Sequence, residues 1–132
     1  MKLEFPYVLK QDRYYPIIDL VIKNDNNSIK TDAIVDSGAV ISIFQGNVAE
    51  YIGLKIEEGQ EKLFQGIGGK IIGYIHNVKI KINNIEFSCK IAFSDELSTS
   101  LNIIGRESFF DNFLITFDEK NKKLFLESGS LL

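Results

Sequence analysis

Ala33-Ile34-Val35-Asp36-Ser37-Gly38-Ala39 is the stretch that decides the fold, because an acid follows directly on a run of strand-forming apolar residues. Burial penalises an isolated charge heavily, so a carboxylate in this place needs a reason. Gly38 would let the backbone or a bound molecule approach closely. Taken alone, Asp-Ser-Gly is a common turn tripeptide, and a plain turn is the alternative interpretation.

The composition is that of a globular protein, and we expect one domain over residues 1–132. Hydrophobic residues make up 45% of the chain and charged residues 25%, with a net charge of -3. This is enough apolar material to offset the entropy of ordering. Acids and bases are interspersed, so no basic patch indicates nucleic acid.

We also expect no contact with a membrane, because no apolar run approaches the roughly 18 residues of a membrane span. The first residues, MKLEFPYVLK, lack the apolar core of a signal peptide. The single cysteine, Cys89, cannot close an intrachain disulfide, and no CxxC pair or His/Cys cluster offers a metal site. We expect a buried, inert thiol and a cytoplasmic location.

β-Branched and aromatic residues dominate, and turn residues recur between short apolar runs, a pattern typical of a closed or folded β structure. The expected strands and apolar runs are Tyr14–Lys23, Ile29–Val35, Ile41–Phe44, two stretches within Lys62–Ile82, Ile85–Phe93, Leu101–Ile104, Leu114–Phe117 and Lys123–Glu127.

Two short helices are expected between these strands. One covers Gln45–Ile52, with Asn47 as a possible N-cap and Gly53 as the stop. The other covers Glu107–Phe113. The polar stretch Glu57–Lys62 is expected to be a loop.

Two further motifs accompany the acidic one. Gly66-Ile67-Gly68-Gly69 lies between two extended stretches, and Ile103-Ile104-Gly105-Arg106 leads into the second expected helix. A phosphate loop would need a helix after the glycines, whereas Lys70–Ile75 has the pattern of a strand. The glycine-rich segment is therefore predicted to be a flexible hairpin tip.

In this order, the three motifs resemble those of the retropepsin family of aspartic proteases, over roughly Ile29 to Phe117. The resemblance implies an all-β subunit, a closed barrel with one or two short helices, that is active as a C2 homodimer. Pepsin-like enzymes carry two Asp-Thr/Ser-Gly loops in one chain, whereas this chain has one. A two-fold axis would bring the second copy of the loop to the same site.

By the same resemblance, Asp36 is the catalytic residue, and Ser37, Gly38 and Ala39 complete its loop. The two Asp36 carboxylates would share one proton, one acting as general base on a water and the other as general acid. Ser37 would brace the two loops against each other. The resemblance implies hydrolysis of peptide bonds in extended polypeptides without a metal or organic cofactor.

Gly66, Ile67, Gly68 and Gly69 would form the tip of a flap that opens for substrate and then excludes water. The flap and the backbone of Gly38 would pair with an extended peptide, as in strand addition. Plain core packing is the alternative role for the expected pocket walls, which are Ala39, Val40, Phe64, Ile67, Leu101 and Ile103.

Gly105 and Arg106 would support the catalytic loop. In retroviral members the matching arginine pairs with an aspartate just after that loop, but here the stretch is Val40-Ile41, without an acid. We therefore expect Arg106 to form a structural salt bridge with another partner. The candidates are Asp12, Asp32 and Glu107.

Three questions stay open at this stage. The only histidine, His76, has no expected catalytic role, since adjacent Asp36 and Ser37 cannot act as orienter and nucleophile of a serine-protease triad. A non-catalytic peptide-binding or dimerisation module of the same fold is the alternative function. The segments Phe5–Leu9 and Leu124–Leu126 could interleave in a dimer sheet or pair within one chain.

Overall fold

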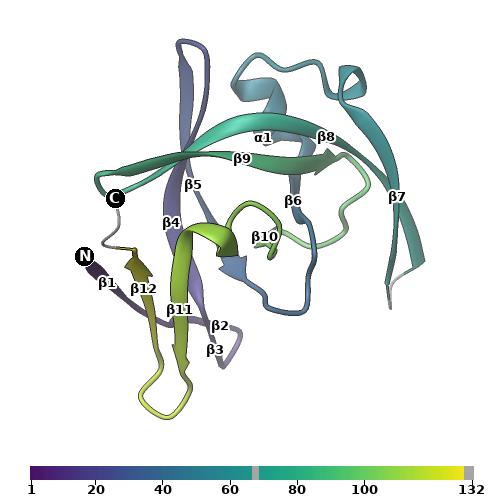
Figure 1. Cartoon of the computed structure of the whole chain (residues 1–132). Coiled ribbons are helices and arrows are strands. Elements are labelled where there is room, and N and C mark those ends of the chain that lie inside the picture. The colour runs from purple at the N-terminus through teal and green to yellow at the C-terminus, as the bar shows by residue number, and fades with distance from the viewer. Residues whose placement is uncertain (67–68, 130–132) are drawn as a thin grey trace.

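The structure, a computed structural model, is built mostly of β-strands and describes residues 1–66 and 69–129 (Figure 1). Strand β8 pairs with β9 along one edge and with β4 along the other, so the main sheet closes on itself. The barrel strands, in order, are β4 (Ile17–Asn24), β5 (Asn27–Val35), β10 (Asn102–Ile104), β6 (Ser42–Gln45), β9 (Ile85–Ser94) and β8 (Gly69–Ile82). β7 (Gln60–Gly66) extends this sheet as the antiparallel partner of β8. The expected all-β barrel is confirmed.

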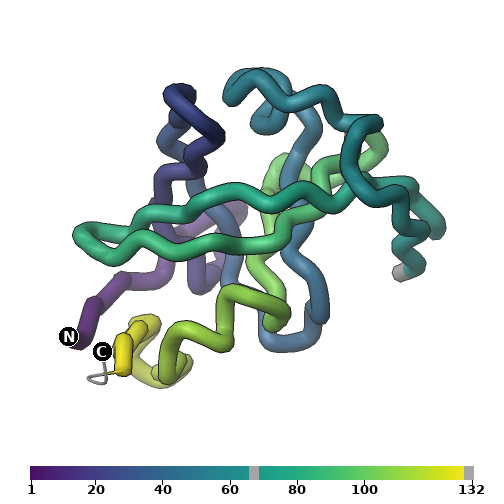
Figure 2. The backbone as a smooth tube through the Cα atoms, turned by 45° about the horizontal axis from the view of Figure 1, so that its top comes forward, coloured from purple at the N-terminus to yellow at the C-terminus, as the bar shows by residue number. Residues whose placement is uncertain are grey.

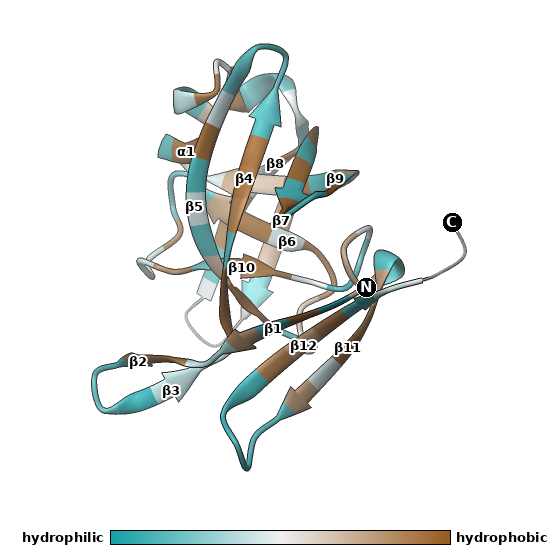
Figure 3. Ribbon diagram, turned by 90° about the vertical axis from the view of Figure 1, so that its left-hand side faces the viewer, coloured by the Kyte–Doolittle hydropathy of each residue, from teal (hydrophilic) through white to brown (hydrophobic). Residues whose placement is uncertain are grey.

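A second sheet lies at one end of the barrel (Figure 3). It is antiparallel and contains β1 (Lys2–Pro6), β12 (Lys123–Ser128) and β11 (Phe113–Asp118), in that order. Near it, β2 (Val8–Lys10) and β3 (Arg13–Tyr15) form a separate hairpin. Because β1 pairs with β12 of the same chain, the terminal segments form an intrachain sheet.

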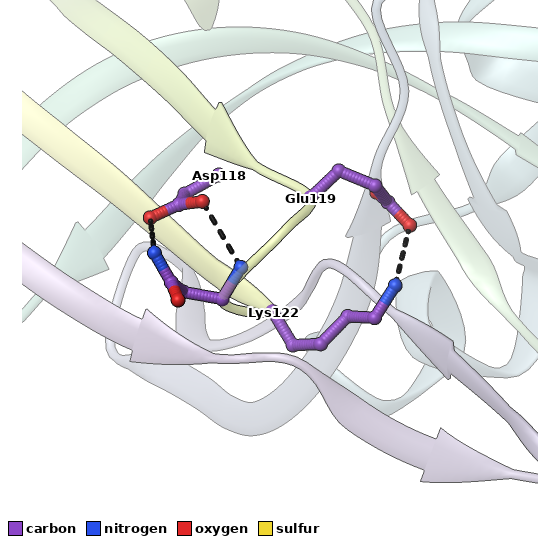
Figure 4. A network of polar contacts seen from close by, with 4 residues as sticks. Asp118, Glu119 and Lys122 are labelled. Atoms are coloured by element: carbon purple, nitrogen blue, oxygen red, sulfur yellow. Dashed lines mark hydrogen bonds and ion pairs between the residues drawn. The ribbon is translucent and has the colours of Figure 1, made fainter.

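Side chains close the turn between β11 and β12 (Figure 4). The Asp118 carboxylate accepts hydrogen bonds from the backbone and side-chain nitrogens of Asn121 at 3.1 and 2.9 Å, and these bonds lower its pKa. Lys122 pairs with Glu119 at 3.0 Å, while its carbonyl accepts a hydrogen bond from the backbone of Tyr7 at 2.8 Å. The turn thereby joins the second sheet to the chain segment that enters the barrel.

The expected strand Tyr14–Lys23 is divided at Pro16 into β3 and β4. Proline has no N–H to donate to a ladder, so it favours a break between strands. The carbonyl of Pro16 still accepts a hydrogen bond from Val35, at 2.9 Å. Because of this break, β3 lies outside the barrel sheet and β4 is the first strand of the barrel.

The helical predictions need three corrections. Helix α1 (Gly46–Tyr51) is capped by Gln45 without a side-chain hydrogen bond, so Asn47 is not its N-cap. The chain then turns at Gly53 with a φ of 80°, a conformation that favours glycine.

The stretch expected as a loop, Glu57–Lys62, contains the end of the short 3-10 helix η1 (Ile56–Glu58) and the start of β7. Within the second expected helix, only η2 (Phe110–Asn112) is helical, as a single 3-10 turn.

The hydrophobic core lies under the long β8–β9 hairpin that crosses the molecule in Figure 2. Buried residues alternate with exposed ones in the second half of β8, so this part buries one face, whereas the last four residues of β9 are all buried. At the end of the barrel, the rings of Phe87, Phe109 and Phe113 contact one another with centroids 5.3–5.6 Å apart. This aromatic cluster attaches the second sheet to the barrel.

Asn102 is a buried polar residue that ties together the two neighbours of β10. Strand β10 runs parallel to β5 and antiparallel to β6. The Asn102 side chain accepts a hydrogen bond from the Gln45 backbone at 2.9 Å and donates to the Asp32 carbonyl at 3.0 Å. It also donates to the Thr31 hydroxyl at 3.3 Å. One side chain therefore satisfies polar groups on both flanking strands.

We predict that Asn102→Ala lowers the free energy of unfolding by about 2–4 kcal/mol, because it leaves a backbone donor and a backbone acceptor without their partner. Urea denaturation followed by circular dichroism measures the change. Asn77→Ala, at an exposed position of β8, is the matched control and should stay within about 0.5 kcal/mol of wild type. Equal losses for the two variants would contradict the role given to Asn102.

Cys89 lies in β9 and is 2% exposed, as expected. Burial raises the pKa of its thiol to about 11, against a smaller opposing effect of the hydrogen bond from the Ser108 hydroxyl, 3.4 Å from Sγ. The folded chain thus keeps this proton at a pH where the unfolded chain, with a thiol pKa near 9.0, loses it. The resulting stability is present below pH 9 and declines as the pH rises through the folded pKa.

We predict that between pH 9 and 11 wild type loses about 1–3 kcal/mol more unfolding free energy than Cys89→Ala does. Chemical denaturation of both proteins at a series of pH values measures the difference, and the shared titration of other groups cancels in the comparison. Parallel pH profiles would show that the thiol is not desolvated in the folded chain.

Candidate active site

The loop from Asp36 to Ile41 connects β5 to β6, and the end of β10 holds it in place. Asp36 donates its backbone N–H to the Ile104 carbonyl at 2.9 Å. The Arg106 N–H donates to the Ala39 carbonyl at 2.9 Å, and the Glu107 N–H donates to that of Val40 at 2.7 Å. Backbone bonds thus fix the loop at both ends.

The carboxylate of Asp36 is oriented by its own loop. Its Oδ1 accepts a hydrogen bond from the Gly38 N–H at 2.8 Å, and its carbonyl accepts one from Ala39 at 3.2 Å. A Cβ at Gly38 would lie 3.2 Å from that same Oδ1, a tight contact. Asp36 is half-buried, while Ser37 and Gly38 are exposed. The acid therefore lies next to two exposed residues, of which Gly38 presents only backbone.

Gly105 is the point at which a side chain is sterically excluded. A Cβ there would lie 2.8–2.9 Å from backbone atoms of Ile41 and from the Ala39 carbonyl. Its N–H donates to the hydroxyl of buried Ser42 at 2.9 Å. Ser42 was not predicted as part of the site, because a lone serine in an apolar run carries no signal of its own.

The prediction that Arg106 forms a salt bridge is wrong for the residues that the structure describes. Its side chain is exposed and forms no ion pair with any acid of residues 1–66 and 69–129, including Asp12, Asp32 and Glu107. Val40 stands where an acid would follow the loop, and no carboxylate of the described residues forms an ion pair with the guanidinium. Arg106 supports the loop through its backbone N–H instead.

A cavity of about 690 Å³ lies between the loop and the hairpin of β7 and β8. Its size is that of a typical ligand site. The loop contributes Gly38, Ala39, Val40 and Ile41, and the hairpin contributes Lys62, Phe64, Gln65, Gly69 and Ile71. The remaining walls are Ile43, Leu97, Ser98 and Ile103. The walls are mainly apolar.

Of the expected pocket residues, Ala39, Val40, Phe64 and Ile103 line this cavity and Leu101 does not. Leu101 precedes β10 and donates its N–H to the Thr99 hydroxyl at 3.1 Å, so it belongs to the preceding bend.

The structure brings Gly66 and Gly69 opposite each other at the end of the hairpin. Ile67 and Gly68 of the expected flap lie outside the described residues. Ile71 was missed, although its pairing with Phe64 follows from the hairpin register. Leu97 and Ser98 come from a loop whose position no pattern indicates.

Side chains anchor the base of this hairpin where the β8–β9 ladder ends, at Tyr74 and Phe93. The Ile72 N–H donates to the Glu96 carboxylate at 2.9 Å. Its carbonyl accepts a hydrogen bond from the Ser94 hydroxyl at 2.6 Å. The loop that provides these bonds continues into Leu97 and Ser98, so it joins the hairpin to the cavity wall.

His76 lies away from these groups. Its Nε2 donates to the Ile56 carbonyl at 2.9 Å, and its ring packs edge-on against Phe93 with centroids 5.9 Å apart.

Among residues 1–66 and 69–129, no group of three or more His, Cys, Asp or Glu side chains is placed to hold a metal ion. The helices of the same residues are all too short or too polar to span a membrane.

We predict that Glu96→Ala speeds amide hydrogen exchange in residues 69–73 by about tenfold, because the Ile72 N–H loses a charged acceptor. Glu96→Gln keeps an acceptor oxygen and should exchange close to wild type. Exchange followed by mass spectrometry measures both, with peptides from β4 as the internal reference. If Glu96→Ala exchanges like wild type, Glu96 does not anchor the hairpin.

Comparison with known proteins agrees with this geometry. The family model described as aspartyl protease matches residues 12–111. DNA damage-inducible protein 1 of Kluyveromyces lactis is 36% identical over 93 residues, which are 66% of this chain and 22% of that protein. The chain therefore spans about a fifth of the length of this curated relative.

Two solved structures share the fold. A retropepsin-like aspartic protease from Rickettsia conorii matches with a TM-score of 0.65 and 17% identity, over 98% of this chain and 95% of that chain. The EIAV protease complexed with the inhibitor HBY-793 matches with a TM-score of 0.58 and 19% identity, over 79% of this chain and 93% of that chain. With a family model that covers most of its length and a retropepsin-like fold, this chain belongs to the aspartyl protease family.

Proposed function

We propose that this chain is one subunit of a homodimeric aspartic endopeptidase, with Asp36 of each copy as the catalytic residue. The observation that carries the proposal is the position of Asp36, half-buried at the end of a barrel strand and beside a mainly apolar cavity. A carboxylate held in a fixed loop next to an apolar cavity is a candidate for acid–base chemistry on a bound molecule. The family to which the chain belongs gives that chemistry its class.

The chain supplies only half of the chemistry. The sequence contains one Asp-Ser-Gly loop, whereas water activation by carboxylates needs an acid and a base at the same place. A two-fold axis beside the exposed residues Ser37 and Gly38 would bring two Asp36 side chains together. The loop is already held rigidly by backbone bonds, so dimerisation would only have to place two preformed halves.

In the dimer, the two carboxylates share one proton, because two negative charges at close range repel strongly. The ionised carboxylate takes a proton from a bound water, which attacks the peptide carbonyl. The protonated carboxylate donates its proton to the carbonyl oxygen. The tetrahedral adduct then collapses: the carboxylate that took the water's proton gives it to the amide nitrogen as the C–N bond breaks, and the other carboxylate takes a hydroxyl proton from the adduct. No acyl-enzyme forms, and the dyad returns to its singly protonated state.

The substrate would lie extended between the loop and the β7–β8 hairpin. Backbone groups near Gly38 and along the hairpin would pair with the peptide backbone, as in strand addition. Val40, Phe64 and Ile103 would then contact apolar side chains near the bond that is cut. We propose the hairpin as the flap, with Ser94 and Glu96 as its fixed base.

The outer edge of β11 is our candidate for part of the dimer contact. β11 is the last strand of the second sheet, and it exposes Leu114 and Phe117, which are 65% and 37% accessible. It follows directly on the segment that holds the catalytic loop. An unpaired strand edge with apolar side chains is suited to pairing with a second copy.

We predict that Asp36→Asn lowers kcat/KM for a cleaved peptide by at least about a thousandfold, because an amide cannot act as the general base. The asparagine Oδ1 can still accept the hydrogen bond from Gly38, so the fold and the dimer should survive. Asp32→Asn, which removes the same charge four residues earlier, on β5, is the control and should keep near wild-type turnover.

Peptide turnover and mass in solution are the two measurements. Wild-type turnover by Asp36→Asn would exclude the mechanism. A folded wild-type protein that binds peptides and cleaves none would favour the non-catalytic module instead.

A further inference from the structure

We propose that Lys62 sets the substrate class, so that the site prefers peptides with an acidic residue on each side of an apolar centre. This inference rests on the proposed function, because it takes the cavity as the peptide groove. Lys62 is the only charged residue among the described residues that line the cavity. The other walls are glycines, apolar side chains, Gln65 and Ser98.

The strand register explains why Lys62 is on the inner side of the hairpin. Side chains alternate along a strand, so Lys62 and Phe64 of β7 share one face, about 7 Å apart. Opposite them in β8 are Gly73 and Ile71. Gly73 presents no side chain, and the Phe64 ring lies against this position, since a Cβ on Gly73 would be 3.0 Å from Phe64 Cε2. Along β7, Phe64 lies nearer the hairpin tip and Lys62 lies further from it, so the two side chains line successive parts of the groove.

The neighbouring acids lie on the other face of the hairpin. Glu61 is paired with Tyr74, whose pKa is raised by burial first and then by the charges of Glu61, Glu57 and Glu96. Within residues 1–66 and 69–129, no carboxylate lies within 4.0 Å of the Lys62 ammonium. Its charge is therefore available to a bound peptide.

A substrate carboxylate near Lys62 gains the attraction of an exposed ion pair, which corresponds to about a two- to fivefold gain in affinity. A substrate lysine would lose by repulsion. Because the two-fold axis of the proposed dimer repeats Lys62 at the other end of the groove, the preference should apply on both sides of the cut bond. The chain's net charge of -3 acts in the opposite direction, so a preference for acidic peptides must come from a local cation.

The test measures binding to the Asp36→Asn protein, so that it does not depend on turnover. The probes are fluorescein-labelled octapeptides with an apolar Phe-Leu centre and with glutamate, glutamine or lysine two residues out on each side. Fluorescence anisotropy gives Kd for each. We expect about two- to fivefold tighter binding for each glutamate relative to glutamine, and weaker binding for lysine. Molar salt should remove most of the difference, since it screens exposed charges.

Two further variants, made in the Asp36→Asn protein, distinguish the effect of the Lys62 charge from the effect of the protein's overall charge. Lys62→Glu should reverse the order, so that the lysine peptide binds most tightly. Lys70→Glu changes the same charge on the same hairpin, but its side chain is not among the cavity walls, and it should keep the order. Equal affinities for the three peptides, or a loss of preference in both variants, would overturn the role of Lys62.

The wild-type protein then shows which proposal has failed. Cleavage of all three peptides with equal kcat/KM would overturn the Lys62 inference and leave the endopeptidase intact. Tighter binding of the glutamate peptide without any cleavage would support the Lys62 inference and contradict the endopeptidase. Neither binding nor cleavage of any probe would overturn both.

Discussion

The insertion of β10 between β5 and β6 determines where the Asp36 loop lies. Because β10 bonds to both strands, the loop that joins them has to pass around its end. Gly105 lies against this loop with no room for a side chain, and Asn102 ties the flanking strands at the other end of β10. Asp36 therefore has a fixed backbone in a single subunit. A rigid carboxylate at a surface loop is what a symmetric partner needs to complete a site without reordering it.

The hairpin of β7 and β8 lies across the cavity from this loop and is the flap in the proposed function. At Ile72, β8 still pairs with β7 but no longer with β9, and the side chains of Glu96 and Ser94 bond to the Ile72 backbone instead. In the proposed function this hairpin has to open for a peptide, and so few bonds to the rest of the barrel would make the local free energy of opening low. The cavity between the loop and the hairpin is apolar except for Gln65, Ser98 and Lys62. In the proposed function, shape and apolar contacts would therefore set most of the substrate preference, and the charge of Lys62 would add a smaller preference.

Most strands were predictable from sequence because alternation and turn residues report burial directly, as in β8 and β9. The secondary-structure predictions are wrong where tertiary contacts outweigh the local conformational preference of the sequence. Pro16 splits a continuous apolar run, and the segment after Arg106 is drawn into loop contacts that leave room for only one helical turn. In the candidate site, the acidic loop and Gly105 were readable as motifs. Leu97 and Ser98 were not, since a loop brings them to the cavity from elsewhere in the sequence.

If two Asp36 side chains from different subunits act together, mixing wild-type and Asp36→Asn subunits should reveal it. Asp36→Asn protein is titrated into wild type at a constant total concentration well above the dimer dissociation constant, and cleavage is measured after exchange of subunits. If both carboxylates are required, activity falls with the square of the wild-type fraction. A linear fall would show that each subunit works alone and would contradict the account.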